Sequence, residues 1–162
     1  MIEEAIRMWE LFREGVVGEL ENVPDDKLDW RPGDGARTLR ELGLHIVAAG
    51  KGFVDELVAD EANFMRLRDP RVQQSMIDAL GDPKSKAELV DLVRSSGAEG
   101  FARLRENAER LETGRMSNGQ TRFSGVWFAA SHEMYHRGQV ATYARGMGLV
   151  PAMTQRIQAM TK

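Results

Sequence analysis

Cysteine is absent from the 162 residues of this chain. No disulfide can hold the fold together, and no thiolate of the chain itself can bind a metal ion or attack a substrate. Any sulfur chemistry would therefore need a thiol from a second molecule. The length suits one sizeable hydrophobic core, so we expect residues 1–162 to form a single domain.

Long apolar runs are missing as well, since no stretch approaches the roughly 20 residues that span a bilayer. The first residues alternate acidic and apolar side chains, unlike a signal peptide. We therefore expect a cytoplasmic protein without a membrane partner. The formal net charge is −3, which gives no electrostatic support for binding nucleic acid.

Apolar residues recur at helical spacing in four long segments, and no strand pattern competes with them. We expect helices over about 2–21, from 38 to at least 57, over 85–112, and from 121 or 124 to 146. A shorter helical piece is expected between Pro70 and Gly81, while residues 152–162 fit either one or two further turns or a loose end. The pattern predicts an all-α four-helix bundle, and the long connection between helices two and three leaves its topology open.

Two of these helices begin with a capping-box sequence. Thr38-Leu39-Arg40-Glu41 precedes the second helix, and Ser85-Lys86-Ala87-Glu88 precedes the third. In a capping box the hydroxyl and the carboxylate each bond a backbone N–H at the helix start, so both helices should begin at these residues.

Only three histidines occur, and their spacing is the most informative feature of the chain. His132 and His136 stand four apart, which stacks both rings on one helical face at about 5–6 Å between Cβ atoms. His45 falls on the apolar face of the second helix. Each histidine alone could be a hydrogen-bonded core residue, but three on core faces favour one mononuclear metal site. Three nitrogen ligands would leave a position open for water or substrate.

The pair also matches His-Glu-x-x-His, the motif of zinc metalloproteases in which the glutamate is the general base. Such enzymes take a further ligand downstream, but no Asp, Glu or His follows His136. Glu133 is also rotated by about 100° from His132 on the helix. These observations disfavour proteolysis, and no catalytic residue can be named from the sequence.

A longer motif extends this pair to His132-Glu133-Met134-Tyr135-His136-Arg137-Gly138-Gln139. With His45 on the second helix, and the loop Leu28-Asp29-Trp30-Arg31-Pro32 ahead of it, the chain resembles the DinB/YfiT-like family of metalloenzymes. The resemblance implies a four-helix bundle in which His45, His132 and His136 bind a divalent metal ion, commonly zinc or nickel. It also implies a homodimer.

The resemblance further implies an activity, because better-understood relatives use mycothiol, bacillithiol or a similar small thiol as cosubstrate. The leading hypothesis is a thiol-dependent S-transferase or isomerase that acts on a small electrophile. One alternative is a hydrolase that uses a metal-bound water. Another is a catalytically silent bundle that serves metal binding or dimerisation.

Four further residues are candidates for supporting the site or lining its pocket. Glu41 precedes His45 by one turn and could accept its distal N–H, although capping competes for the carboxylate. Gln139 faces either the pocket or the helix surface, and Tyr143 either lines a cavity or packs in the core. Arg137 suits an anionic substrate or a salt bridge.

Overall fold

Four long helices dominate the fold, and a computed structural model describes residues 1–161. The long helices are α1 (Ile2–Glu21), α2 (Leu39–Val58), α4 (Lys86–Glu106) and α6 (Arg122–Gly146). Shorter elements are η1 (Asp25–Lys27), η2 (Phe64–Arg68), α3 (Pro70–Asp78), α5 (Ala108–Thr113) and α7 (Ala152–Met160). The β pairing found within residues 1–161 is one isolated bridge, between Arg115 and Thr121. The expected all-α class is confirmed.

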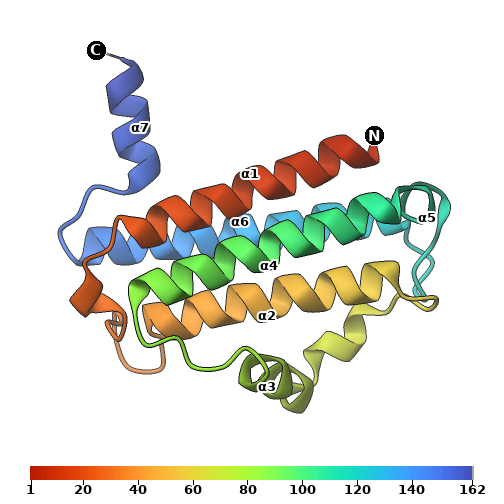
Figure 1. Cartoon of the computed structure of the whole chain (residues 1–162), viewed down its shortest axis with the longest axis horizontal. Coiled ribbons are helices and arrows are strands. Elements are labelled where there is room, and N and C mark those ends of the chain that lie inside the picture. Colours follow the sequence, from red (N-terminus) through yellow and green to blue (C-terminus); the bar gives the residue numbers. More distant parts are fainter. Residues whose placement is uncertain (162) are drawn as a thin grey trace.

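The long helices pack side by side as a bundle (Figure 1). α1 packs against α4 and α6, and α2 packs against the same two helices, so α1 and α2 occupy opposite corners. Figure 1 shows that α1 and α6 run in one direction, whereas α2 and α4 run in the other. Because α2 and α4 are parallel neighbours, the chain must travel back along the bundle between them. The long connection expected from the sequence follows from this topology.

That connection covers one side of α2 with two short helical elements, η2 and α3. α3 begins at Pro70, directly after Asp69, whose side chain accepts the N–H of Arg71 at 2.8 Å. Proline suits the first helical turn because its missing N–H would have no partner there. Neither η2 nor α3 contains a buried residue. We call residues 64–78 the cover, because they lie over the site described below.

The two capping boxes differ in the structure. Thr38 and Glu41 form the complete reciprocal pair at the start of α2. Ser85 accepts the N–H of Glu88 at 3.2 Å, but the Glu88 carboxylate accepts from Lys84 N at 2.7 Å instead of from Ser85. The second prediction is therefore correct for the helix start and wrong for the carboxylate.

The expected helix over 85–112 is interrupted, which the sequence analysis did not foresee. Asn107 leaves helical geometry, with φ −108° and ψ 19°, and separates α4 from α5. Apolar spacing continues across this point through Leu104, Ala108 and Leu111, so periodicity alone could not reveal the break.

The buried carboxylate of Glu19 binds the start of the C-terminal tail. The tail, left open between helix and loose end, forms α7, which projects from the bundle (Figure 1). The buried Glu19 carboxylate accepts the N–H groups of Ala152 at 2.8 Å and Met153 at 3.1 Å. An anion at the first amides of a helix stabilises that helix, so Glu19 anchors α7 to α1.

The core divides into two apolar clusters along the bundle axis. One contains Val16 and Leu20 of α1, and the other contains Ile6 and Trp9 of the same helix. A polar layer between them holds Arg13. This polar layer interrupts the apolar core at the level of the bundle where the candidate site, described below, also lies.

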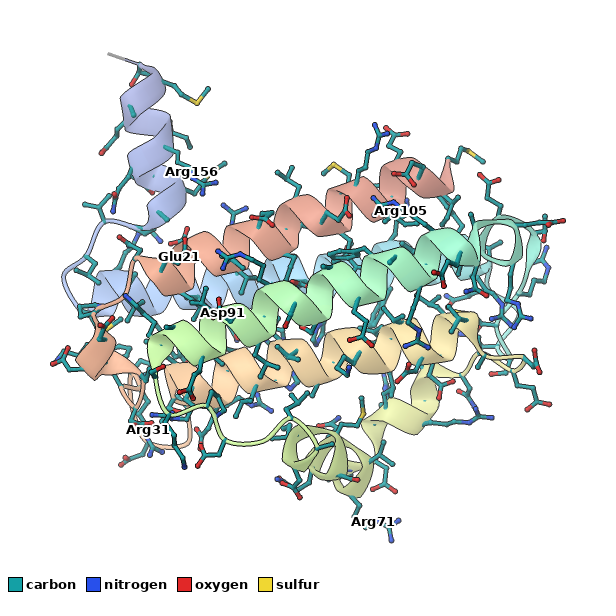
Figure 2. The ribbon with its side chains drawn as sticks, in the orientation of Figure 1. Glu21, Arg31, Arg71, Asp91, Arg105 and Arg156 are labelled. Atoms are coloured by element: carbon teal, nitrogen blue, oxygen red, sulfur yellow. The ribbon has the colours of Figure 1, made fainter. Side chains whose placement is uncertain are left out.

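Charged side chains cover the outer surface of the bundle (Figure 2). Arg105 of α4, for example, pairs with Glu3 and Glu10 of α1. Exposed pairs of this kind contribute little to stability, typically about 0–1 kcal/mol each. No helix within residues 1–161 is both long and apolar enough to cross a membrane.

Candidate metal centre

The three histidines of the chain meet between α2 and α6. Nε2 of His136 lies 3.1 Å from Nε2 of His45 and 3.1 Å from Nε2 of His132. One nitrogen from each ring belongs to a set within 4.8 Å of one another. Two nitrogens that each lie about 2.0–2.1 Å from a tetrahedral zinc ion would be roughly 3.3–3.4 Å apart. The separations in this structure therefore fit a three-nitrogen donor set.

Burial favours the neutral form of all three rings. His136 is buried, while His45 and His132 are half-buried. Loss of hydration, followed by repulsion from His136 and from Arg37, lowers the pKa of His45 to about 3. The same causes lower the pKa of His132 to about 4. Burial also lowers the pKa of His136, although a hydrogen bond to Gln139 opposes this shift. Neutral imidazoles carry the lone pairs that a metal ion requires.

Gln139 fixes the orientation of the central histidine. Its Oε1 lies 2.7 Å from Nδ1 of His136, one helical turn away on α6. An amide oxygen can only accept, so this contact places the ring proton on Nδ1 and leaves Nε2 with a free lone pair. Nε2 is the atom that faces the other two histidines, so the contact prepares His136 as a ligand.

The other three supporting candidates lie elsewhere. The Glu41 carboxylate accepts the N–H of Thr38 at 2.7 Å, so its capping role prevails. The Tyr143 hydroxyl donates to the carbonyl of Arg37 at 3.0 Å, and its ring packs edge-on against Trp30. The Arg137 side chain lies against Gly15 of α1. None of the three lines the two cavities that border His132.

Glu133 faces the core instead of the histidine site. Its carboxylate forms an ion pair with Arg13 and accepts from the indole N–H of Trp9. Arg13 also donates to the carbonyl of Val93 at 2.9 Å and to Ser96 Oγ at 3.1 Å. We call these five residues the Arg13–Glu133 network. Because Glu133 is only 2% exposed and occupied by these donors, it is not available as the general base of a protease.

Two glycines make room for this network. A Cβ atom on Gly50 of α2 would lie 2.6 Å from Nη2 of Arg13. One on Gly97 of α4 would lie 3.0 Å from Cγ of Arg13. Larger residues at these positions would collide with a buried arginine that carries three hydrogen-bonding nitrogens. The Arg13 side chain thus fills the space that Gly97 leaves between the helices.

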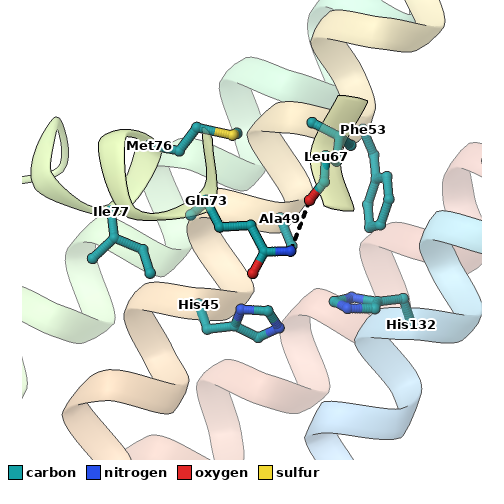
Figure 3. Close-up of a pocket in the computed structure, with 9 residues that line it drawn as sticks. His45, Ala49, Phe53, Leu67, Gln73, Met76, Ile77 and His132 are labelled. Atoms are coloured by element: carbon teal, nitrogen blue, oxygen red, sulfur yellow. Dashed lines mark hydrogen bonds between the residues drawn. The ribbon is translucent and has the colours of Figure 1, made fainter. Parts of the chain in front are cut away.

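Two cavities adjoin the histidines. A small one of about 70 Å³ is bordered by His45, His132 and apolar side chains of α2 and the cover. A larger cleft of about 510 Å³ also reaches His132. The two share a wall that contains Phe53 and Gln73. Gln73 lies above the histidines and donates to the carbonyl of Leu67 at 2.7 Å (Figure 3). A 510 Å³ cleft is within the usual size range for small-molecule sites.

Sequence reasoning missed these walls because the cover shows little periodicity. The residues of the cover meet α2 only once the chain has folded. No spacing in the sequence therefore connects Gln73 with His45. Phe53 of α2 is a buried member of the apolar core. Its ring, however, lies 5.1 Å from that of His132, between centroids, and thus forms part of the site as well as of the core.

Comparison with known proteins places this arrangement in a family. A search of curated proteins finds no match to the chain. The model of the DinB superfamily matches residues 8–140, a span that includes all three histidines, the whole of α2 and most of α6. The chain therefore belongs to the DinB superfamily.

Proposed function

We propose that His45, His132 and His136 hold a divalent metal ion, with zinc and nickel as the first candidates. The convergence of three neutral imidazole nitrogens carries this proposal. An ordinary core histidine would instead be expected to bond a backbone or side-chain group of its own. A bound divalent ion would lower the pKa of a thiol or water in contact with it.

The residues around the histidines support binding without supplying a competing base. His136 is oriented by Gln139, and Glu133 is held in the core by Arg13. The phenyl ring of Phe53 and side chains of the cover enclose a small cavity on one side of the cluster. Together these groups hold the nitrogens in place and leave the site open toward the cleft.

The reaction we propose is transfer of a small thiol to an electrophilic substrate. The thiolate sulfur forms a bond to an electrophilic carbon, and the leaving group departs with its bonding electron pair. The chain contains no cysteine, so no internal thiol competes with the cosubstrate. The cleft beside His132 offers space for a small molecule of this kind. An isomerase would instead add the thiolate to a conjugated carbon–carbon double bond, allow rotation about the resulting single bond, and then expel the thiolate so that the double bond forms again.

Metal analysis of protein purified without an affinity tag tests the site. We expect close to one divalent ion per chain, and large losses in His45→Ala, His132→Ala and His136→Ala. Thr142→Ala is the matched control, because Thr142 is an exposed residue of α6 whose hydroxyl bonds only to Gly138 O. Unchanged metal content in all three histidine variants would reject the proposed site.

Product analysis tests the reaction. The metal-loaded protein is incubated with a panel of aryl and alkyl halides, with and without mycothiol, bacillithiol or glutathione. Thioether products that require both the thiol and the histidines are expected. Turnover that proceeds equally without thiol, with water incorporated into the product, would replace the transferase by a hydrolase.

A homodimer in the cytoplasm completes the proposal. Exposed apolar side chains on α6 and α7 support self-association, among them Met134, Tyr135 and Ile157. Light scattering at several protein concentrations tests it, and a constant monomer mass would remove the dimer from the proposal.

A further inference from the structure

The cleft beside His132 has an unusual charge for this protein. Aspartate and glutamate together outnumber lysine and arginine by 25 to 22 in the chain. No carboxylate from residues 1–161 lines the cleft, whereas Arg68 does. The remaining polar lining consists of amides, hydroxyls and the His132 ring. A negatively charged ligand would therefore meet one cation and no anion.

Arg68 is unlike its arginine neighbours. Arg66, two residues before it on η2, pairs with Glu56 and Glu61. Arg71, three residues after it, pairs with Asp69. Arg68 has no carboxylate within ion-pair distance anywhere in the described range 1–161. Its exposed guanidinium borders the cleft.

Three phenyl rings form the apolar wall of the same cleft. The ring centroids of Phe53 and Phe64 are 4.9 Å apart, those of Phe53 and Phe128 are 5.6 Å apart, and those of Phe64 and Phe128 are 5.7 Å apart. Trp127 also lines the cleft. Phe128 is 54% exposed, and an exposed aromatic cluster in a concave surface is typical of a binding site for an apolar ring.

We propose that the substrate of this site is an aromatic carboxylate. Its ring lies against Phe53, Phe64 and Phe128, its carboxylate is bound by Arg68, and its reactive carbon is directed toward His132. Arginine binds carboxylates through two parallel N–H···O bonds, which gives orientation as well as affinity. The assignment rests on the proposed function only in naming this ligand as the substrate, because the cleft itself contains no metal ligand other than His132.

Calorimetric binding of matched probes tests the assignment. The probes are 2-naphthoate, its neutral isostere 2-naphthamide, and the cation 2-naphthylmethylammonium, each titrated into chelator-treated and zinc-loaded protein. In both forms 2-naphthoate should bind about tenfold more tightly than the amide, because one charged hydrogen-bonding pair is added. The ammonium probe should bind most weakly.

Variants separate the two parts of the cleft. Arg68→Gln should abolish the preference for 2-naphthoate over the amide, while Arg68→Lys should keep part of it. Arg66→Gln is the matched control on the same short helix and should keep the full preference. Phe128→Ala should weaken the binding of all three naphthalene probes by a similar factor, because the exposed ring contributes only apolar contact.

The outcomes distinguish this inference from the proposed function. A preference that is present in metal-free protein and lost in Arg68→Gln supports the carboxylate site, even if the histidine variants show that no metal binds. A preference that appears only with zinc and survives in Arg68→Gln overturns the role of Arg68. Equal binding of all three probes overturns the charge assignment, whatever the metal content.

Discussion

Glu133 and His132 are neighbours on α6, but their side chains lie on two faces of the helix with different surroundings. Glu133 faces the core, where Arg13, Trp9 and the layer around them satisfy its charge. His132 faces α2, where three imidazole nitrogens converge without any carboxylate partner. A helix turns by about 100° per residue, so one step along the chain separates the two environments.

The difference shows which of the two clusters has its charges and hydrogen-bonding groups paired within the bundle. The Arg13–Glu133 network pairs each charge with a charge or hydrogen-bond partner inside the bundle. The histidine cluster pairs one ring nitrogen with Gln139, and its Nε2 contacts join the three rings only to one another. The first cluster should therefore matter for folding, and the second for binding a positive ion.

The largest expected effect comes from breaking the Arg13–Glu133 network. Glu133→Ala leaves Arg13 buried without a counter-charge, which should reduce the free energy of unfolding by about 3–5 kcal/mol. Urea denaturation measures this loss. His136→Ala, one turn away and equally buried, should cost much less in metal-free protein because no opposite charge is abandoned.

A double variant sharpens the result. Arg13→Met combined with Glu133→Leu removes both charges and should recover much of the lost stability, since apolar pairs of similar volume often replace buried ion pairs well. Equal losses in Glu133→Ala and His136→Ala would contradict the distinction between the two faces.

An intermediate effect is expected from the hydrogen bond between His136 and Gln139. Gln139→Leu removes the acceptor at Nδ1 of His136 and should weaken zinc affinity by about 10- to 100-fold. Competition with a chromogenic chelator measures the affinity. Glu41→Gln is the comparison, because Glu41 caps α2 and its replacement should alter stability without altering affinity. Equal affinities for wild type and Gln139→Leu would show that the ring is oriented by packing alone.

The smallest effect concerns pH. The folded protein keeps His45 and His132 neutral down to about pH 3 and 4, whereas the unfolded chain binds protons at its ordinary pKa near 6.5. Because the unfolded state then holds more protons, stability should fall as pH drops below 6.5. In metal-free protein the melting temperature should decrease by a few degrees between pH 6.5 and 5, before most carboxylates protonate. His45→Asn should reduce this slope, and an unchanged slope would argue against a depressed pKa at that ring.

The helices, and the helical faces that carry the histidines, could be predicted from the sequence. Both depend on the spacing of residues within a single helix. Helical spacing of apolar side chains predicted the bounds of α1 and α6 closely, and placed His45 on the same face as Leu42 and Ile46. A position facing the pocket was one of the two alternatives stated for Gln139, but its contact with Nδ1 of His136 was not predicted. Each of these inferences uses residues within one helix.

What was missed depends on partners far apart in the chain. Arg13 lies 120 positions from Glu133 in the chain. In the sequence of α1, nothing distinguishes it from the other charged residues beside the apolar stripe. Arg122 is likewise buried, and donates to the carbonyls of Leu57 and Ala59 at the end of α2. No local pattern predicts that a charged side chain will be folded inward to meet a distant carbonyl or carboxylate.

The cover has a consequence for how the histidines are reached. Residues 64–78 bury no side chain fully, while α2 beneath them contributes many buried residues to the core. Segments with few buried contacts open at a small fraction of the global unfolding free energy. The cover, with Gln73, can thus swing away from the histidines while the four long helices stay folded. Access to the site depends on the cover, whereas the stability of the fold depends on the long helices. Substitutions in the cover can therefore change access to the site while the fold stays stable.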